Sequence, residues 1–210
     1  ILNNTIIEWA RTKYDFDANF AELSHYGVIP ELKIAHGLRG RWNIVKNVIS
    51  STNVDSVLDV GGFGNYKSVS RQHDCINITP HHGCKQYAGK HLPYNNSTYD
   101  IVLIETVLHH AAEDALSVMY ESMRVSRKYV LIAEDVIDRR ASVDVFKSYR
   151  NHDHAAIYRS SHEWISLAML IGLKVYKIMY LHRVPIHIAR EASIKCKLGF
   201  APMLYILFQK

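Results

Sequence analysis

The 210-residue sequence predicts a single α/β domain with a mostly parallel sheet, an antiparallel hairpin at one edge and helices on both faces. Two observations predict this class. Short runs of β-branched and aliphatic residues alternate along the chain with segments of helical periodicity. One such run, 56–60, leads into an acid and a glycine cluster. A strand followed by a glycine-rich turn and a helix is how open α/β sheets build a nucleotide-type site.

Hydrophobic spacing predicts the N-terminal elements. Residues 1–50 are predicted to be helical, because apolar side chains recur there at helical spacing, at Ile34, Leu38, Trp42, Val45 and Ile49. The strand at 56–60 is followed by a short helix near 66–71 and a second strand at 75–78. The polar segment 81–90 predicts a degenerate or absent third strand.

The central elements are a buried strand at 99–105, an amphipathic helix at 113–125 and a strand at 129–134. The helix carries its acids first and its bases last, as the helix dipole favours. The polar and basic stretch that follows, 138–158, is a candidate lid or substrate loop.

The C-terminal elements begin with a capping box. Ser160 and Glu163 have the spacing of this motif and open a helix that ends at Gly172. The apolar runs 174–181 and 203–208 predict two closing strands with a basic insertion between them. These two strands can form the antiparallel hairpin at the edge of the sheet.

Charge is distributed unevenly along the chain. Residues 1–138 carry 13 Lys and Arg against 16 Asp and Glu, whereas residues 139–210 carry 12 against 4. The positive last third suits a polyanionic partner such as RNA, because phosphate contacts dominate affinity for nucleic acids. A solvated basic face without a partner explains the same composition.

Three cysteines cannot form a disulfide framework, and an odd count without a signal peptide favours a reducing compartment, hence the cytoplasm. No apolar run is long enough to predict a membrane span or a membrane partner. The chain starts at Ile1 rather than Met, which suggests a domain of a longer protein, such as a viral polyprotein, or a part of a larger complex.

The segment 56–65, SVLDVGGFGN, resembles the first motif of the Rossmann-like (class I) S-adenosylmethionine-dependent methyltransferases, an aliphatic run followed by D-x-G-x-G-x-G. Phe63 stands where that family has its central glycine, and Asn65 where it has the last. Three further modules follow in the family's order, at 92–110, 115–135 and 161–176. The resemblance spans 56–208 and implies S-adenosylmethionine as cofactor and S-adenosylhomocysteine as product.

The family's organisation implies one methyltransferase domain over 1–210. Its parts would be a helical N-terminal segment (1–50), a cofactor-binding half (51–137) and a basic substrate-side half (138–210).

The resemblance implies cofactor contacts for six residues, which are Lys46, Asp59, Gly61, Gly62, Gly64 and Asn77. The acid and the glycines would lie against the methionine and ribose portions, since a Cβ would push the backbone away from the ligand. Asn77 occupies the position of the acid that usually grips the ribose. Lys90 and His91 stand where the family has an acid near the adenine.

The segment 39–49, RGRWNIVKNVI, is similar to the stretch before the glycine motif in mRNA cap guanine-N7 methyltransferases, whose lysine contacts the cofactor carboxylate and matches Lys46. This resemblance implies capped RNA as substrate and a ring nitrogen as acceptor, which needs no general base. Glu105 would accept from the guanine edge, and His109 and Tyr158 would stack on it or contact its edge. The cations expected to meet the RNA are Arg41, Arg139, Arg140, Lys147, Arg150 and Arg159.

Other interpretations stay open. The modules at 92–110 and 161–176 are also common among methyltransferases of small metabolites, and the departures at Phe63 and Asn77 fit a catalytically silent partner subunit. Lys46, His109, Tyr158 and the arginines can equally be surface or wall residues. No metal is expected, because the clusters of His81, His82 and Cys84 and of His152 and His154 lack the spacing of a tetrahedral site.

Overall fold

The computed structural model describes residues 16–80, 83–87, 90–138, 155–184 and 203–210. In this part of the chain, eight strands form one sheet in the order β1-β7-β8-β6-β5-β2-β3-β4. The strands are β1 (Glu31–His36), β2 (Ser56–Val60), β3 (Gln72–Asn77), β4 (Lys85–Gln86), β5 (Tyr99–Glu105), β6 (Ser126–Asp135), β7 (Lys174–Val184) and β8 (Met203–Gln209). Only β8 runs antiparallel to its neighbours, β6 and β7, and every other described pairing is parallel.

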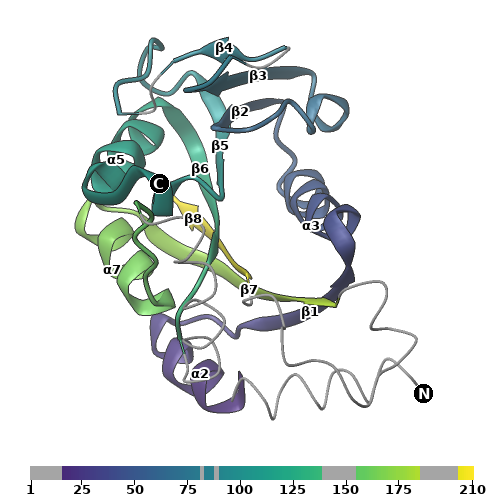
Figure 1. The fold of residues 1–210 in the computed structure, drawn as a ribbon, viewed down its shortest axis with the longest axis vertical. Coiled ribbons are helices and arrows are strands. Elements are labelled where there is room, and N and C mark those ends of the chain that lie inside the picture. The colour runs from purple at the N-terminus through teal and green to yellow at the C-terminus, as the bar shows by residue number, and fades with distance from the viewer. Residues whose placement is uncertain (1–15, 81–82, 88–89, 139–154, 185–202) are drawn as a thin grey trace.

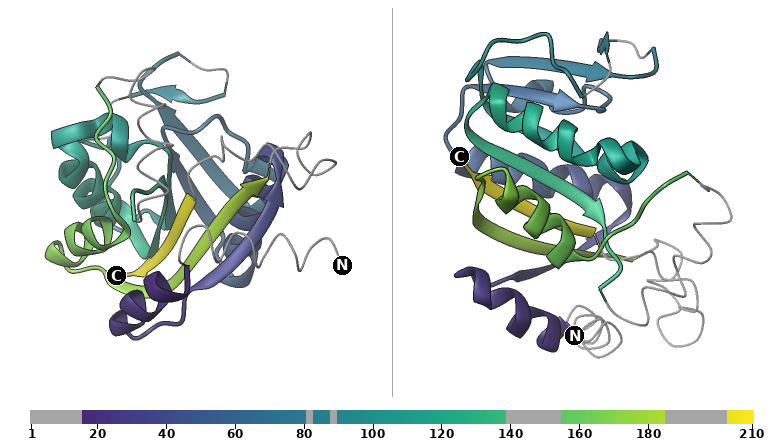
Figure 2. Two further views of the ribbon diagram at one scale, coloured as in Figure 1. Left: turned by 60° about the horizontal axis from the view of Figure 1, so that its bottom comes forward. Right: turned by 90° about the vertical axis from the view of Figure 1, so that its left-hand side faces the viewer.

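Helices cover both faces of this sheet. The α-helices are α2 (Phe16–Leu23), α3 (Gly37–Ser51), α4 (Leu108–Ala111), α5 (Ala115–Val125) and α7 (Ser161–Leu170). Figure 1 shows α3 on one side of the sheet and α5 with α7 on the other. The right-hand view of Figure 2 shows α5 and α7 side by side on their face.

The side chains of the central strand β5 alternate between two separate apolar cores, as the two-residue period of a strand requires. Ile101 and Leu103 pack into the core beneath α3, and Val102 and Ile104 into the core beneath α5 and α7. All four are fully buried, so β5 is apolar on both faces. The carboxyl ends of the parallel strands β2, β3 and β5 therefore meet at one edge, where ligands bind in open α/β sheets.

Most predicted elements are confirmed. The strands expected at 56–60 and 99–105 have those bounds, and the helix expected at 113–125 is α5, preceded by the 3₁₀ turn η3 (Ala112–Asp114). The degenerate third strand is the two-residue β4. The capping box at α7 is present, since Ser160 accepts from the Glu163 amide and the Glu163 carboxylate accepts from the Ser160 amide at 2.7 Å.

Two predictions about the N-terminal half are wrong. Residues 31–36 form strand β1 rather than part of a helix, because they pair in parallel with β7. The helix expected at 66–71 is only the 3₁₀ turn η2 (Lys67–Val69). The predicted hairpin of β7 and β8 exists, and β1 extends the sheet beyond it.

Cys75 on β3 and Cys84 just before β4 form a disulfide, with their Cα atoms 4.5 Å apart. This pairing contradicts the expectation of cysteines kept reduced. The bond ties the segment that carries β4 to the strand next to β2. It thereby fixes one side of the edge where β2 and β3 end.

Candidate functional site

A tight glycine turn follows β2. The backbone of Gly61 has φ = +73°, and its amide donates to the Ile76 carbonyl on β3 at 2.7 Å. A Cβ at Gly61 would lie 2.3 Å from Cγ2 of Val107, and one at Gly62 would lie 1.9 Å from a carboxylate oxygen of Asp59. Both positions therefore exclude a side chain, which agrees with a turn built for close approach.

The larger of two cavities beside this turn is mainly apolar. It has a volume of about 230 Å³ and is lined by Val60, Gly61, Ile78, Tyr87, Lys90, Val107, His110, Ala111, Asp114 and Val118. Ile78 is 70% exposed and Tyr87 37% exposed, so the rim presents apolar surface to solvent. An apolar hollow with a few polar groups at its rim is typical of a small-molecule site.

The smaller cavity, about 200 Å³, lies on the α3 side of the same turn and also contacts Gly61. An ion pair crosses it: Arg41 on α3 donates from Nε to Oε1 of Glu105, at the end of β5, at 3.0 Å. Tyr66 donates to the other carboxylate oxygen at 2.6 Å. Burial raises the pKa of the Tyr66 hydroxyl far above its ordinary value, and the Glu105 carboxylate adds to this, so Tyr66 acts as a donor.

Asp59, which also lines the smaller cavity, is 1% exposed. Neither of its carboxylate oxygens makes a hydrogen bond of normal geometry within the described residues, although the backbone amide of Gly64 interacts with the carboxyl group. Burial, together with the nearby charge of Glu105, raises the pKa of this carboxyl to about 7, although the backbone amide of Gly64 pulls it down. Such a buried carboxyl is unfavourable in its ionised form, so it either keeps its proton or pairs with a cationic ligand.

Asn77, predicted to hold a ribose, has its side chain turned towards the glycine turn. Its Nδ2 donates to the carbonyls of Gly61 and Gly62 at 3.2 and 2.9 Å. Its Oδ1 accepts from the amide and the hydroxyl of Thr79, both at 3.0 Å. The side chain therefore braces the backbone that separates the two cavities, and its predicted contact with a ribose stays a prediction.

The predicted substrate residues His109 and Tyr158 lie together, on the side of the sheet that α5 and α7 cover. Their rings stack with centroids 4.9 Å apart and planes inclined by 16°. Nδ1 of His109 lies 2.5 Å from Oε2 of Glu134, a side chain that is fully buried on β6. The other oxygen of Glu134 accepts from the amides of Val107 and Leu108, so this carboxylate also holds the start of α4.

The predicted RNA-binding cations have different surroundings. Arg41 lies inside the smaller cavity, with its side chain only 15% exposed. The guanidinium of Arg159 stacks over the Trp164 ring at 4.8 Å and donates to the Ala112 carbonyl, so it joins the loop before α7 to the 3₁₀ turn η3. The remaining candidates, Arg139, Arg140, Lys147 and Arg150, lie outside the described residues. Lys46 is partly buried on α3 and lines neither of the two cavities.

Three residues that contact the candidate site residues were not predicted from the sequence. They are Tyr66 and Thr106, which contact the Arg41–Glu105 pair, and Glu134, which holds His109. Thr106 has φ = +55°, a conformation that is uncommon for a threonine and concentrates at functional sites. Its position directly after a buried strand was the signal available in the sequence.

No group of three or more His, Cys, Asp or Glu side chains placed to hold a metal ion occurs among the described residues. His81, His82, His152 and His154 lie outside them. None of the helices in the described part of the chain is long and apolar enough to cross a membrane.

Comparison with known proteins gives a result at the level of the fold. No protein-family model matches the sequence, and no curated protein matches it. Many solved structures are similar in fold, and three of them illustrate the likeness. A candidate methyltransferase from Bacillus halodurans is 13% identical, with a TM-score of 0.61, and the alignment covers 80% of this chain and 97% of that one. A chain bound to the Haloferax volcanii methyltransferase activator Trm112 is 14% identical, with a TM-score of 0.60, and the alignment covers 82% of this chain and 92% of that one. A third structure is an S-adenosylmethionine-dependent methyltransferase from Thermotoga maritima, a candidate histamine N-methyltransferase. It is 14% identical, with a TM-score of 0.57, and the alignment covers 82% of this chain and 94% of that one.

The chain therefore has the fold of the class I S-adenosylmethionine-dependent methyltransferases. The glycine turn and its two cavities lie at the end of β2 and β5, which is the edge where this class of sheet binds ligands.

Proposed function

We propose that the protein is an S-adenosylmethionine-dependent methyltransferase that binds its cofactor across the glycine turn. The observation that carries the proposal is the contrast between two cavities that share Gly61. One is apolar and suits a purine ring, and the other contains a cation and a buried carboxyl, which suit an amino acid. Together the two volumes fall within the usual range of about 300 to 1,000 Å³ for ligand sites.

The residues of the smaller cavity fit the amino-acid end of the cofactor. Asp59 would accept from the α-ammonium group, which would complete its buried carboxyl. Arg41 would bind the α-carboxylate, since a guanidinium is suited to carboxylates and has donors beyond the Nε that Glu105 uses. We assign this contact to Arg41 in place of Lys46, because only Arg41 lines the cavity.

When bound, S-adenosylmethionine would supply a methyl group on a sulfonium: the lone pair of the acceptor would form a bond to the methyl carbon as the carbon–sulfur bond breaks in line, and S-adenosylhomocysteine would leave. The protein's part is to hold the two ends of the cofactor and exclude water, because alignment provides most of the acceleration in such a reaction. Tyr66 fixes Glu105, and Glu105 fixes Arg41, so these contacts orient the amino-acid end before the ligand arrives.

For the acceptor, the finer hypothesis is guanine N7 of an RNA cap. It is supported by the excess of 12 basic over 4 acidic residues in 139–210. A small-molecule acceptor is the second candidate, and a specific observation favours it. Arg41 and Glu105, predicted to meet the RNA and the guanine edge, bind each other inside the cofactor cavity. The similar Thermotoga protein is itself a candidate for methylating a small amine.

The first test is calorimetric binding of S-adenosylhomocysteine to the native protein and to Asp59→Ala and Arg41→Gln. Arg71→Gln is a matched control, because Arg71 is exposed at the amino end of β3. We expect micromolar binding that weakens at least tenfold in the first two variants and is unchanged in the control. Absence of binding to native protein would refute an active methyltransferase and favour a catalytically silent partner subunit.

The acceptor is tested by transfer of labelled methyl groups to GpppN-capped, N7-methylated and uncapped RNAs and to small amines such as histamine. Labelling of GpppN-capped RNA alone would support the guanine-N7 hypothesis. Labelling of a small amine and of no RNA would contradict it. Salt dependence separates the two further, since RNA binding weakens steeply as salt rises.

A further inference from the structure

A row of exposed cations lies along the edge of the sheet opposite the glycine turn. At this edge the parallel strands β7, β6, β5, β2 and β3 begin, and the antiparallel strand β8 ends. The strand register aligns these ends, because Lys174 pairs with Gln209, Gln209 pairs with Tyr129, and the Lys210 amide donates to the Lys128 carbonyl at 3.0 Å. In the order of the sheet, the cations of this cationic row are Lys174, Lys210, Lys128, Arg127 and Arg71.

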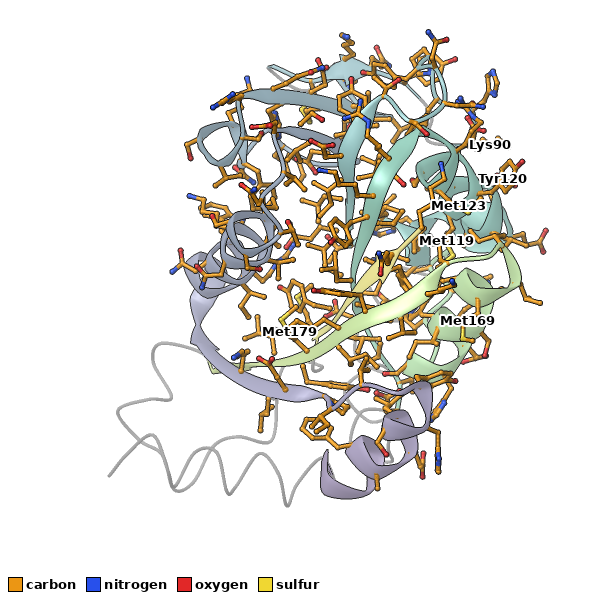
Figure 3. All side chains as sticks on the ribbon, turned by 180° about the vertical axis from the view of Figure 1, so that it is seen from behind. Lys90, Met119, Tyr120, Met123, Met169 and Met179 are labelled. Atoms are coloured by element: carbon orange, nitrogen blue, oxygen red, sulfur yellow. A yellow bond between two sulfur atoms is a disulfide. The ribbon has the colours of Figure 1, made fainter. Side chains whose placement is uncertain are left out.

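The cationic row is long enough to contact several phosphate groups. From β7 to β3 it crosses five steps between neighbouring strands, and at about 4.8 Å per step it is about 24 Å long. In Figure 3, the labelled Met123 and Met169 mark the last turns of α5 and α7, the helices that lead into β6 and β7 at this edge.

Asp100, the acid in the middle of the row, is directed into the protein. It is buried, and one oxygen of its carboxylate accepts from the backbone amides of residues 55 and 56 at 3.0 and 3.3 Å. The other oxygen accepts from Arg127 at 2.8 Å and lies 3.5 Å from Nζ of Lys128. One buried carboxylate therefore faces two cations that are each about half exposed.

The rest of the row is neutralised even less. Arg71 lies 3.6 Å from Asp55, but these side chains are 89% and 74% exposed, and ion pairs so exposed contribute little. Nζ of Lys210 donates to an uncharged acceptor, the Ser126 carbonyl, at 2.9 Å. Within the described part of the chain, five cations thus stand against the two acids that contact them, which leaves a positive potential along this edge.

A hollow and an exposed aromatic ring accompany the cations. A surface cavity of about 450 Å³ lies between Arg71, Arg127 and Lys128, and all of its lining residues are polar or charged. Towards the other end of the row, Tyr176 on β7 is 52% exposed, and its ring lies 5.7 Å from that of Tyr129. The edge therefore combines a charged groove with an aromatic surface that is open to solvent.

We propose that the cationic row binds the phosphate backbone of a single-stranded nucleic acid, with Tyr176 as the platform on which one base stacks. A positive groove that follows the backbone, together with exposed aromatic rings, is how proteins bind single strands without reading their sequence. The proposal does not rest on the proposed function, because this edge lies opposite the glycine turn and its two cavities. It predicts binding of RNA in the absence of any cofactor.

The salt dependence of binding gives the expected size of the effect. Each phosphate contact to a single strand contributes about 0.7 to the slope of log affinity against log salt concentration. Removing two cations of the row should lower this slope by about 1.4. Over the tenfold range from about 1 M down to about 0.1 M salt, this change corresponds to about a 25-fold loss of affinity at the lower concentration.

The experiment measures fluorescence anisotropy of a labelled single-stranded RNA of about 20 nucleotides at several salt concentrations. The test variant is Arg71→Gln with Lys174→Gln, at the two ends of the row. The control variant is Lys33→Gln with Lys85→Gln, which removes two exposed charges that pair with acids elsewhere in the sheet. Urea unfolding should give native stability for the test variant, since both of its side chains are exposed.

The role of Tyr176 has its own pair of variants. Stacking of one base on an aromatic ring is worth about 1 to 3 kcal/mol, so Tyr176→Ala should weaken RNA binding about tenfold or more. Tyr176→Phe keeps the ring and should bind as native protein does. Equal affinities of Tyr176→Ala and native protein would overturn this part of the proposal.

The remaining outcomes decide whether the row itself binds RNA. A lower slope and affinity in the test variant, with native values in the control variant, support the proposal. Equal losses in both variants overturn it, because only net charge would then matter. Absence of RNA binding by native protein overturns it too, as does binding of phosphatidylserine-containing vesicles in preference to RNA. Binding of S-adenosylhomocysteine is measured separately, so failure here leaves the proposed function standing.

Discussion

Replacing Asp59 with asparagine removes a buried carboxyl group whose ionisation is unfavourable in the folded protein. Burial, with the nearby charge of Glu105, raises the pKa of Asp59 from 3.8 to about 7. Between these two values the folded protein keeps a proton that the unfolded chain has lost. Because the folded state binds more protons in that window, the free energy of unfolding decreases as the pH rises through it.

The magnitude follows from the two pKa values. A tenfold change in an ionisation equilibrium corresponds to about 1.4 kcal/mol, so the difference between 3.8 and about 7 corresponds to about 4 kcal/mol above neutral pH. Asparagine has no proton to lose and escapes this penalty. The stability of Asp59→Asn relative to native protein should therefore rise by about 2 to 3 kcal/mol between about pH 5 and about pH 8.

The assay is urea unfolding followed by circular dichroism at several pH values in that interval. Asp55→Asn provides the matched control, because it makes the same chemical change at a side chain that is 74% exposed. Its stability should stay parallel to that of native protein. Parallel curves for Asp59→Asn and native protein would refute the reasoning, since they would mean that the buried carboxyl is not penalised.

Four further predictions use other parts of the molecule. The binding of S-adenosylhomocysteine below about pH 7 should release close to one proton from Asp59, measured by calorimetry in buffers of different ionisation enthalpy, and affinity should rise with pH. Asn77→Asp should lower the unfolding free energy by about 2 kcal/mol in urea titrations, because a carboxylate cannot donate to the two carbonyls that Asn77 contacts. Cys84→Ser should cost about 3 kcal/mol for the lost nine-residue cross-link, and a reducing agent should then have no additional effect. Ser160→Ala should lower stability by about 1 kcal/mol through the lost cap of α7, whereas Ser166→Ala in mid-helix should not.

The fold class could be predicted because the strands that define it are local signals. Residues 56–60 and 99–105 are buried along their whole length, as expected of strands covered by helices on both faces. Strand β1 could not be predicted in the same way. It exists because β7, more than 140 residues later in the chain, offers it a free parallel edge. Its apolar residues also continue the spacing of the helix that follows, which concealed the boundary.

The site could be predicted in part for the same reason. Asp59 and the glycines could be predicted as site residues because they follow one another directly at the end of a strand. The contact between Arg41 and Glu105 joins residues 64 apart, and the one between Tyr66 and Glu105 joins residues 39 apart. The first pairing depends on how α3 lies across β5, and the second on the turn between β2 and η2 that carries Tyr66. No local sequence pattern encodes either contact. For this reason the resemblance predicts a contact of Lys46 with the cofactor carboxylate, although it is Arg41 that lines the smaller cavity.

The two departures from the methyltransferase motif, Phe63 and Asn77, both affect how the glycine turn is held in position. Phe63 follows Gly62 at a position where a glycine would allow the backbone more conformations. The phenylalanine side chain is 58% exposed, so it does not pack against the turn to hold it in place. Carbonyl oxygens can be braced only by a donor, and an acid at position 77 would have none to offer. Asparagine provides the donor and bonds both carbonyls. An asparagine at this position has no charge with which to bind a ribose. In the proposed function, the affinity for the cofactor would therefore come from its two ends, at the apolar cavity and at Asp59 with Arg41.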